Sequence, residues 1–374
     1  MQASDANASQ SPAVISPASG TPRPQVVVVI CCYNSRQYLP DCLSSLLASA
    51  QPDLYDLQVI AVDNASPDDS AAYIQSNFPQ VHLLRLSQNL GFAGGNNAGW
   101  QYSLAHFPQA EYLVLLNHDT IVDRNWLAPL IEHLQQHPQV GCVQPKILLH
   151  PATDTINTAG NRTHYLGFGY MTGYGQKDDG RFDTPTEIDF PSGCAVMIRA
   201  GLLFQTGLFD DLMFAYLEDA DLAWRMALQG KTSAYVPASR VYHKYEVKAP
   251  FKAYYLLERN RWWMLLTCYR WRTLLLLLPA LLFMEAGQWF FAMRQGLLRE
   301  RLRVYGFFLR PRHWKTLRIR RHHLQRTRLV SDRKLSERFT GVIHFEAIDH
   351  VLLRRVANPV LNAWWKFVRK LLHW

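Results

Sequence analysis

The chain has 374 residues, of which 48% are hydrophobic and 18% charged, so its composition indicates a globular protein and excludes a disordered or collagen-like chain. At ~150 residues per domain, this length predicts two to three domains. The net charge of +9 conceals an asymmetry: residues 1–250 carry 14 Lys/Arg and 23 Asp/Glu, whereas residues 251–374 carry 25 and 7. We therefore expect chemistry in the acidic part and contact with an anionic surface in the basic part.

The first 24 residues are rich in Ala, Ser and Pro and contain no apolar core of a signal peptide. We interpret this segment as a disordered lead-in. The six cysteines form no CxxC pair or other metal-binding spacing, and several lie in apolar runs. They are expected to be buried thiols in a reducing compartment.

From residue 25 onward, apolar runs rich in Val and Ile alternate with segments of helical periodicity. Buried strands that alternate with helices predict an α/β fold with a mostly parallel sheet, in which ligands bind beyond the carboxyl ends of the strands. The predicted strands span residues 25–32, 57–62, 81–86 and 112–116, with helices at about 39–47, 68–77 and 95–106 between them.

Polar residues follow three of these strands. They are Tyr33 and Asn34, Asp63 and Asn64, and Asn117-His118-Asp119. A single Asp after a strand is usually a turn former, but three polar clusters at one sheet edge indicate a site.

A glycine- and asparagine-rich segment, residues 89–99, follows the third strand and contains Gly94, Gly95 and Asn97. Glycines allow a backbone to approach a ligand closely, and a helix N-terminus favours phosphate. The segment is not a GxGxxG motif and Walker A is absent, which argues against a dinucleotide-binding fold. Residues 140–200 are irregular and predict hairpins that shape a second subsite, before a strand at 191–198.

The segment 218–225 places three carboxylates, Glu218, Asp219 and Asp221, at the start of a predicted helix. Acids at this position are favoured by the helix dipole, and Asp221 is spaced to pair with Arg225. From the residues alone, this is either an ordinary acid-rich first turn or part of a site. A histidine, His243, follows the next apolar stretch.

Taken together, these segments resemble the family 2 inverting glycosyltransferases of GT-A fold, in particular a bacterial rhamnosyltransferase-like branch. The resemblance runs from Val26 to His243 and continues more loosely through Arg259-Asn260. The segments that carry it are Tyr33-Asn34, residues 62–66, residues 89–97, residues 116–119, residues 218–225 and His243.

The resemblance implies a role for each of these side chains. Asp119 would be the metal-binding acid of a degenerate DXD motif in which Asn117 replaces the first Asp, and His118 stands where relatives often have Pro. His243 would be the second protein ligand of a divalent ion, Mn²⁺ or Mg²⁺, since a carboxylate and an imidazole suit either. Asp219 would be the general base, with Glu218 in a supporting role.

The resemblance also implies a nucleotide pocket. Asp63 would read the base, with Tyr33, Asn34 and Asn64 alongside. Gly94, Gly95 and Asn97 would lie beneath the diphosphate and the sugar.

The basic C-terminal third predicts a membrane-associating helical region. An apolar stretch at 273–293, interrupted by Pro279 and Glu285, is about as long as a span of ~20 residues; it could cross a membrane, lie in its plane or form a core helix. Residues 310–328 carry eight Lys/Arg and no acid. In the tail, one helical face is apolar and the other basic, which predicts either a membrane-surface helix or a helix that packs on the catalytic domain. The apolar face comprises Leu361, Trp364, Trp365, Val368, Leu371 and Leu372.

We thus expect a lead-in (1–24), a GT-A catalytic domain (25–250) and a basic, Trp-rich helical region (251–374) associated with the cytoplasmic face of the plasma membrane, peripherally or by shallow insertion. The expected reaction moves a sugar from a nucleotide-diphosphate donor, such as dTDP-rhamnose or a UDP-sugar, to a lipid-linked saccharide of the cell envelope. Alternatives are a processive polysaccharide synthase subunit, whose Q-x-x-R-W motif is echoed by residues 258–262, and a catalytically silent nucleotide-sugar- or membrane-binding module. No nucleic-acid motif is present, so nucleic acid is not an expected partner.

Overall fold

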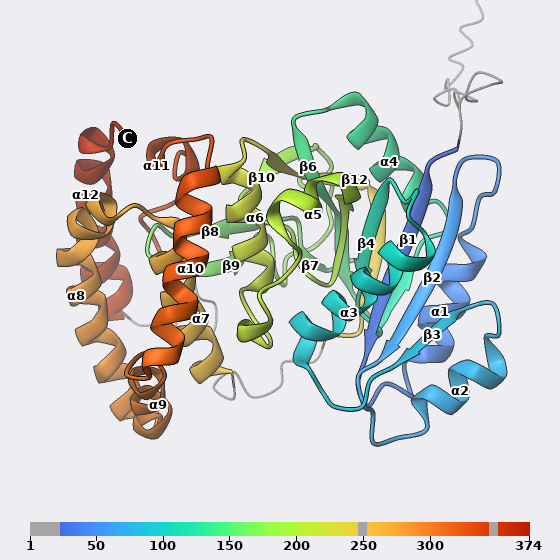
Figure 1. The fold of residues 1–374 in the computed structure, drawn as a ribbon. Coiled ribbons are helices and arrows are strands. Elements are labelled where there is room, and N and C mark those ends of the chain that lie inside the picture. Colours follow the sequence, from blue (N-terminus) through green and yellow to red (C-terminus); the bar gives the residue numbers. More distant parts are fainter. Residues whose placement is uncertain (1–22, 246–252, 344–350) are drawn as a thin grey trace, which may run out of the picture.

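The structure is a computed structural model that describes residues 23–245, 253–343 and 351–374. Most of the predicted lead-in therefore lies outside the described residues. The described chain forms a sheet-based part and a helical part side by side (Figure 1). All six cysteines are buried and unpaired, as predicted.

Within the described residues, a ten-stranded sheet has the order β10-β12-β6-β11-β4-β1-β2-β3, with β5 added to β12 and β7 to β6. The four strands predicted first are confirmed as β1, β2, β3 and β4, which are all parallel. The strands are β1 (Gln25–Cys32), β2 (Asp56–Asp63), β3 (His82–Arg85), β4 (Tyr112–Leu116), β5 (Thr120–Val122), β6 (Val140–Leu149), β7 (Ile156–Thr158), β10 (Thr186–Ile188), β11 (Ala195–Arg199) and β12 (Thr232–His243), while β8 (Asn161–Thr163) and β9 (Gly169–Met171) form a separate hairpin.

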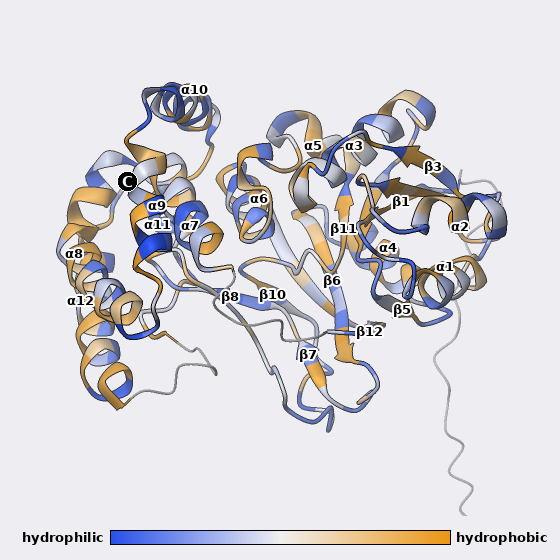
Figure 2. Ribbon diagram, turned by 90° about the horizontal axis from the view of Figure 1, so that it is seen from below, coloured by the Kyte–Doolittle hydropathy of each residue, from blue (hydrophilic) through white to orange (hydrophobic). Residues whose placement is uncertain are grey.

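Helices cover both faces of this sheet because successive residues of its strands point to opposite sides. In β1, Val26, Val28 and Ile30 pack into a core with α1 and α4, whereas Val27 and Val29 pack into a second core with α3, α5 and α6. Figure 2 shows strands such as β1 and β11 in hydrophobic colours between these layers. The helices are α1 (Leu39–Ala48), α2 (Ser70–Asn77), α3 (Gly91–His106), α4 (Leu127–Gln136), α5 (Ala200–Thr206) and α6 (Glu218–Leu228).

The direction of the strands determines which side chains share an edge. β6 and β12 are parallel to each other, and β11 runs antiparallel to both β6 and β4. The strands β6 and β12 therefore run in the same direction as β1–β4. As a result, the carboxyl end of β12, His243, reaches the same sheet edge as the ends of β1, β2 and β4.

The expectation of irregular hairpins over 140–200 is only partly correct. The short strands β7–β10 do form hairpins and bridges, but β6 is a ten-residue strand that is buried along nearly its whole length. Its segment contains Pro145 and Lys146, which masked the strand pattern in the sequence. The buried ammonium of Lys146 is paired with Asp178 at 2.6 Å and also contacts Asp183.

The C-terminal third is helical and shares a hydrophobic core with the sheet-based part. Tyr165 and Trp224 lie in one cluster with residues of α7, α8 and α12. The helices of this part are α7 (Tyr254–Cys268), α8 (Trp271–Arg294), α9 (Leu298–Phe308), α10 (Pro311–Thr327), α11 (Asp332–Leu335) and α12 (Asn358–Leu371).

A buried ion network explains the glutamate in the apolar helix α8. Glu285 contacts the guanidinium of Arg301 on α9, and the same guanidinium lies 2.7 Å from Glu258 on α7. Glu258 also pairs with Arg261 at 2.8 Å. Two acids and two bases are thus mutually neutralised, which is the condition under which charges are tolerated in an interior.

The tail helix corrects one sequence interpretation. The apolar face of α12 packs into the shared core: Leu361 and Val368 are fully buried, and Trp365 stacks on Tyr165 with 4.6 Å between ring centres. The interpretation of this face as a membrane-binding surface is therefore wrong, and its alternative, a helix packed on the catalytic domain, is what the structure shows. The pattern misled because a basic amphipathic helix looks the same whether its apolar face meets lipid or protein.

Candidate active site

Asp119 and His243 come together at the sheet edge. His243 is the last residue of β12, which pairs with β5 so that His243 lies opposite Thr120. The Nε2 atom of His243 is 3.2 Å from Oδ1 of Asp119. Side chains 124 positions apart in the sequence thus meet because both lie at the carboxyl ends of parallel strands.

The ring of His243 is oriented by a second contact. Its Nδ1 lies 3.0 Å from Oδ1 of Asn157 on β7, so Nδ1 carries the proton and Nε2 faces Asp119. Burial alone lowers the pKa of His243, but the neighbouring Cys194 and Asp119 outweigh it and raise the pKa to about 10. The pKa of Asp119 is lowered, since contact with His243 outweighs the effect of burial.

This pair fits a divalent ion. Two ligands at right angles and about 2.1 Å from one Mg²⁺ would be about 3.0 Å apart, close to the observed separation of Nε2 and Oδ1. A metal ion at this position would require Nε2 of His243 to be unprotonated. Among the described residues, no cluster of three or more His, Cys, Asp or Glu side chains is placed to hold a metal. Further ligands would therefore come from substrate or water.

Asp219 is fixed at the start of α6 by two backbone amides. Gly193 N–H donates to Oδ2 over 3.0 Å, and Ala220 N–H donates to Oδ1 over 2.7 Å. A helix N-terminus favours the ionised form of an acid. In the structure, burial dominates and raises the pKa of Asp219, although both amide hydrogen bonds oppose the shift. The adjacent Glu218 is 6% exposed, and burial raises its pKa well above the usual value.

One short segment connects the two groups of side chains. Gly193 donates to Asp219, and the carbonyl of the next residue, Cys194, accepts from Asn117 N–H over 2.8 Å. Two consecutive residues that directly precede β11, Gly193 and Cys194, thus hold both Asp219 and the Asn117–Asp119 turn. The sequence singled out residues 191–198 only as a strand, so this bridging role was missed.

The loop before Asp219 has an unusual backbone. Phe214, Tyr216 and Leu217 all have positive φ angles, of 61°, 71° and 63°. Such angles cost a non-glycine residue free energy and persist only where surrounding contacts impose them. Gly91 has no room for a side chain here, since a Cβ atom would lie 2.4 Å from the carbonyl oxygen of Phe214.

Asn260 on α7 imposes this loop conformation. Its Nδ2 lies 3.0, 2.9 and 2.7 Å from the carbonyl oxygens of Met213, Ala215 and Tyr216. Arg259 adds hydrogen bonds to the carbonyls of Leu212 and Met213. In the sequence, Arg259-Asn260 stands out only as a loose extension of the resemblance, because nothing local reveals which carbonyls these side chains contact.

At the other end of the edge, Tyr33 and Asn34 follow β1, and Asp63 is the last residue of β2, where it pairs with Cys32 of β1. Tyr33 is 45% exposed, and Asp63 is buried with one oxygen accepting from Ser66 N–H at 3.2 Å. These residues therefore line the edge as expected.

The side chains of two further candidates form hydrogen bonds within the fold. Asn64 is buried and exchanges hydrogen bonds with the backbone of Leu90 and Gly91. Asn97 donates to and accepts from the backbone of Phe209, and so holds the segment that precedes α6.

The glycine-rich segment is not a loop beneath a ligand, because α3 already begins at Gly91. A Cβ atom on Gly95 would lie 2.3 Å from the sulfur of Cys31, and one on Gly94 would lie 2.6 Å from Cβ of Leu90. These glycines allow close packing of α3 on the sheet, so Gly94 and Gly95 lie in a helix and not in the expected loop.

Comparison with known proteins agrees with this architecture. The chain is 26% identical over 235 residues to N-acetylglucosaminyl-diphospho-decaprenol L-rhamnosyltransferase of Mycobacterium tuberculosis, a match that covers 58% of this chain and 75% of that protein. It is also 26% identical over 234 residues to the pre-mycofactocin glycosyltransferase of the same organism, covering 62% of this chain and 45% of that protein.

Among solved structures, GalNAc-T7 with UDP, GalNAc and Mn²⁺ has a TM-score of 0.52 at 18% identity. The match covers 66% of this chain and 48% of that one, so the chain spans about half the length of that structure, and the likeness shows the fold. The model of the glycosyl transferase family 2 matches residues 27–203. The predicted resemblance is therefore confirmed for the matched part of the chain: residues 27–203 are similar to the family 2 glycosyltransferases, the fold is GT-A, and one relative is a rhamnosyltransferase.

Proposed function

We propose that this chain is an inverting, metal-dependent glycosyltransferase that moves a sugar from a nucleotide-diphosphate donor to a lipid-linked saccharide of the cell envelope. One observation carries the proposal: the Asp119–His243 pair and the fixed carboxylate of Asp219 are joined through Gly193 and Cys194 at the carboxyl edge of the sheet. A leaving-group site and a base are both needed for direct displacement.

The donor nucleotide would lie along the ends of β1 and β2. Asp63 would accept a hydrogen bond from the imide N–H that uracil and thymine share, so UDP and dTDP donors, including dTDP-rhamnose, are the candidates. Tyr33 and Asn34 would flank the base. The remaining candidates would act indirectly, by holding the backbone of this edge in place. They are Asn64, Gly94, Gly95, Asn97 and Asn117.

Asp119 and His243 would hold Mn²⁺ or Mg²⁺. When bound, the ion supplies positive charge that stabilises the nucleotide diphosphate as a leaving group. Asn157 would keep Nε2 of His243 unprotonated and directed at the ion. His118 points elsewhere, with its Nδ1 3.0 Å from the carbonyl oxygen of Cys31.

Asp219 would remove the proton from the acceptor hydroxyl. The resulting oxygen attacks the anomeric carbon from the face opposite the diphosphate, the bond from that carbon to the phosphate oxygen breaks, and the nucleoside diphosphate leaves with the electron pair. The raised pKa of Asp219 makes it a stronger base than a solvent-exposed aspartate. Glu218, whose pKa burial raises well above its usual value, would help to orient the acceptor.

A lipid-borne acceptor would place the enzyme at the cytoplasmic face of the plasma membrane. The name of the mycobacterial relative specifies an acceptor linked to decaprenol. The strongly basic residues 251–374 would suit an anionic membrane surface.

Isothermal titration of the purified protein with UDP and dTDP, each with Mn²⁺ and with EDTA, tests the donor site. We expect metal-dependent binding of one nucleotide that is lost in Asp119→Ala and kept in Asp56→Asn, a control at the opposite end of β2. No binding under any condition would reject the enzyme in favour of a catalytically silent module. With the acceptor identified, a ladder of products instead of a single addition would indicate a processive synthase.

A further inference from the structure

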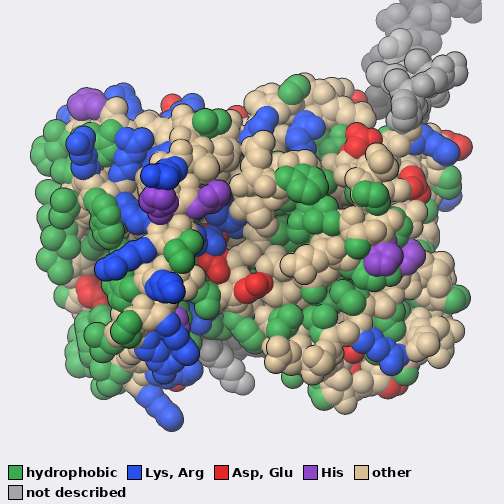
Figure 3. All heavy atoms as spheres, viewed as in Figure 1, with side chains coloured by type: hydrophobic (Ala, Val, Ile, Leu, Met, Phe, Trp, Pro, Cys, Tyr) green, Lys and Arg blue, Asp and Glu red, His purple; other side chains and the backbone are tan. Residues whose placement is uncertain are grey.

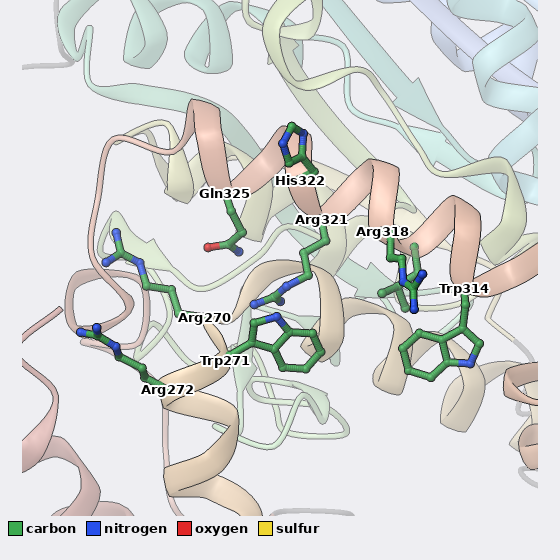
Figure 4. A pocket seen from close by; sticks show the side chains of 9 residues that line it. Arg270, Trp271, Arg272, Trp314, Arg318, Arg321, His322 and Gln325 are labelled. Atoms are coloured by element: carbon green, nitrogen blue, oxygen red, sulfur yellow. The ribbon is translucent and has the colours of Figure 1, made fainter.

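A groove lined by arginine and tryptophan lies between the start of α8 and the length of α10, away from the sheet edge. Its volume is about 780 Å³. Figure 4 shows Arg321 and Gln325 of α10 reaching toward Trp271 of α8, with Arg270 and Arg272 to one side of them and Arg318 and Trp314 to the other. The side chains that matter here are Arg270, Trp271, Arg272, Trp314, Arg318 and Arg321.

The groove is positively charged and no Asp or Glu lines it. In the described part of the chain, no carboxylate forms an ion pair with Arg270, Arg272 or Arg318. Arg272 and Arg318 are exposed at the surface. Arg321 forms the floor: it donates to the carbonyls of Leu266 and Tyr269, and its guanidinium lies 4.1 Å from the centre of the Trp271 ring. Several guanidinium forks around one space match the oxygens of a phosphate.

An exposed apolar ridge begins in this groove. Four exposed side chains recur on one face of α8, at offsets of 0, 4, 7 and 11. They are Trp271 (52% exposed), Leu275 (68%), Leu278 (45%) and Leu282 (62%). The opposite face of α8, including Leu277, is packed against the protein. Among the described residues, α8 is the one helix long and apolar enough to cross a membrane, and 28% of its most apolar window is buried.

The two features adjoin on the surface. Figure 3 shows hydrophobic side chains along the edge of the molecule formed by α8, next to Lys and Arg side chains that gather over α10. An apolar ridge bordered by unpaired cations is complementary to a bilayer, in which acyl chains lie beside anionic phosphates.

We propose that the groove binds the phosphate of an anionic phospholipid and that the α8 ridge lies against the acyl chains of the same leaflet. The proposal rests on the membrane association suggested above and assigns it to α8 and α10, in place of the tail helix. It also relates the membrane to the catalytic edge, because Arg320 on the other side of α10 pairs with Asp221, two residues after Asp219.

Vesicle flotation of the full chain tests this site. The wild-type protein should float with vesicles that contain phosphatidylglycerol and much less with phosphatidylcholine alone. The double variant Arg272→Gln/Arg318→Gln should lower the partition coefficient on anionic vesicles on the order of 10- to 30-fold at low salt. The matched control Arg124→Gln/Lys231→Gln, with the same charge change on the catalytic domain, should lower it far less.

A second variant tests the ridge. Leu275→Ser/Leu278→Ser should weaken binding to both vesicle types, and the melting temperature should stay close to that of the wild type because both side chains are exposed. Equal flotation of the groove variant and the control would overturn the proposal. So would tight calorimetric binding of inorganic phosphate by a protein that stays off vesicles, since this would identify a site for free phosphate.

Failure of this site and failure of the proposed reaction are distinguishable. Transfer to a water-soluble acceptor with a short chain does not require a membrane, so the groove variant should retain it. If the wild type floats but transfers no sugar, the membrane site stands and the reaction is rejected.

Discussion

Arg320 of α10 donates a hydrogen bond of 2.6 Å to Asp221 of α6, and Asp221 also accepts from Arg225 over 2.8 Å. Asp221 is fully buried, and although burial raises its pKa, the two guanidinium groups outweigh this and lower it. The basic third of the chain is thereby fastened to the helix that begins with Glu218 and Asp219.

The first prediction concerns this ion pair. Arg320→Gln should lower the free energy of unfolding by about 3 kcal/mol, because it leaves the buried carboxylate of Asp221 with Arg225 as its one remaining cation among the described residues. Urea unfolding followed by tryptophan fluorescence measures the change. Arg326→Gln, an exposed position on the same helix, is the control and should have little effect; equal stability of the two variants would contradict the role of the pair.

The second prediction concerns the proposed base. Asp219→Asn keeps the size of the side chain and can still accept Gly193 N–H, but it cannot take a proton. Turnover should fall by about 10²- to 10⁴-fold, while calorimetric affinity for the nucleotide should stay nearly unchanged. A variant with wild-type turnover would refute the assignment, and Asp56→Asn serves as the control for loss of one carboxylate.

The third prediction is a pH dependence. The base acts in its ionised form, so kcat/KM should fall as the pH drops through the pKa of the Glu218–Asp219 pair. Since burial raises the pKa of Asp219, the midpoint should lie above 3.8, the ordinary value. A pH–rate profile measures this limb, and a profile that stays flat down to pH 4 would exclude the proposed titration.

Sequence patterns predicted the parallel strands and the edge on which Asp63 and Asp119 lie, because an apolar run followed by a polar residue is a local signal. They also identified His243, although only the resemblance suggested a partner for it. The patterns did not reveal the packing roles of Asn97 and Gly95, whose hydrogen bonds and close contacts depend on how α3 packs against the rest of the chain. Local sequence does not record such tertiary contacts.

The fourth prediction concerns Asn260, whose amide holds the loop with positive φ angles before Asp219. Asn260→Ala removes the donor for three carbonyls, so the loop should relax and displace the base. We expect kcat to fall at least 10-fold with the KM for the donor little changed, since the donor edge lies at β1 and β2. Asn260→Asp, which keeps the shape but presents oxygen to the carbonyls, should be no better than Ala. Rescue by Asp would show that shape alone suffices.

The last prediction concerns the tail helix. Trp365 is 2% exposed, stacks on Tyr165 and donates its indole N–H to the carbonyl of Phe339 over 3.0 Å. Trp365→Ala should therefore lower the free energy of unfolding by about 3–5 kcal/mol, as measured by urea denaturation.

Flotation of the folded Trp365→Ala protein on anionic vesicles should remain like that of the wild type, because the mutated side chain lies inside the protein and faces no lipid. Phe367→Ala, which removes an aromatic ring from the exposed side of the same helix, is the matched control for stability and should cost far less. The opposite result would be that Trp365→Ala leaves the free energy of unfolding unchanged and abolishes flotation. The apolar face of α12 would then have to leave the core to contact the membrane, and the packing of α12 described above would not be the membrane-bound arrangement.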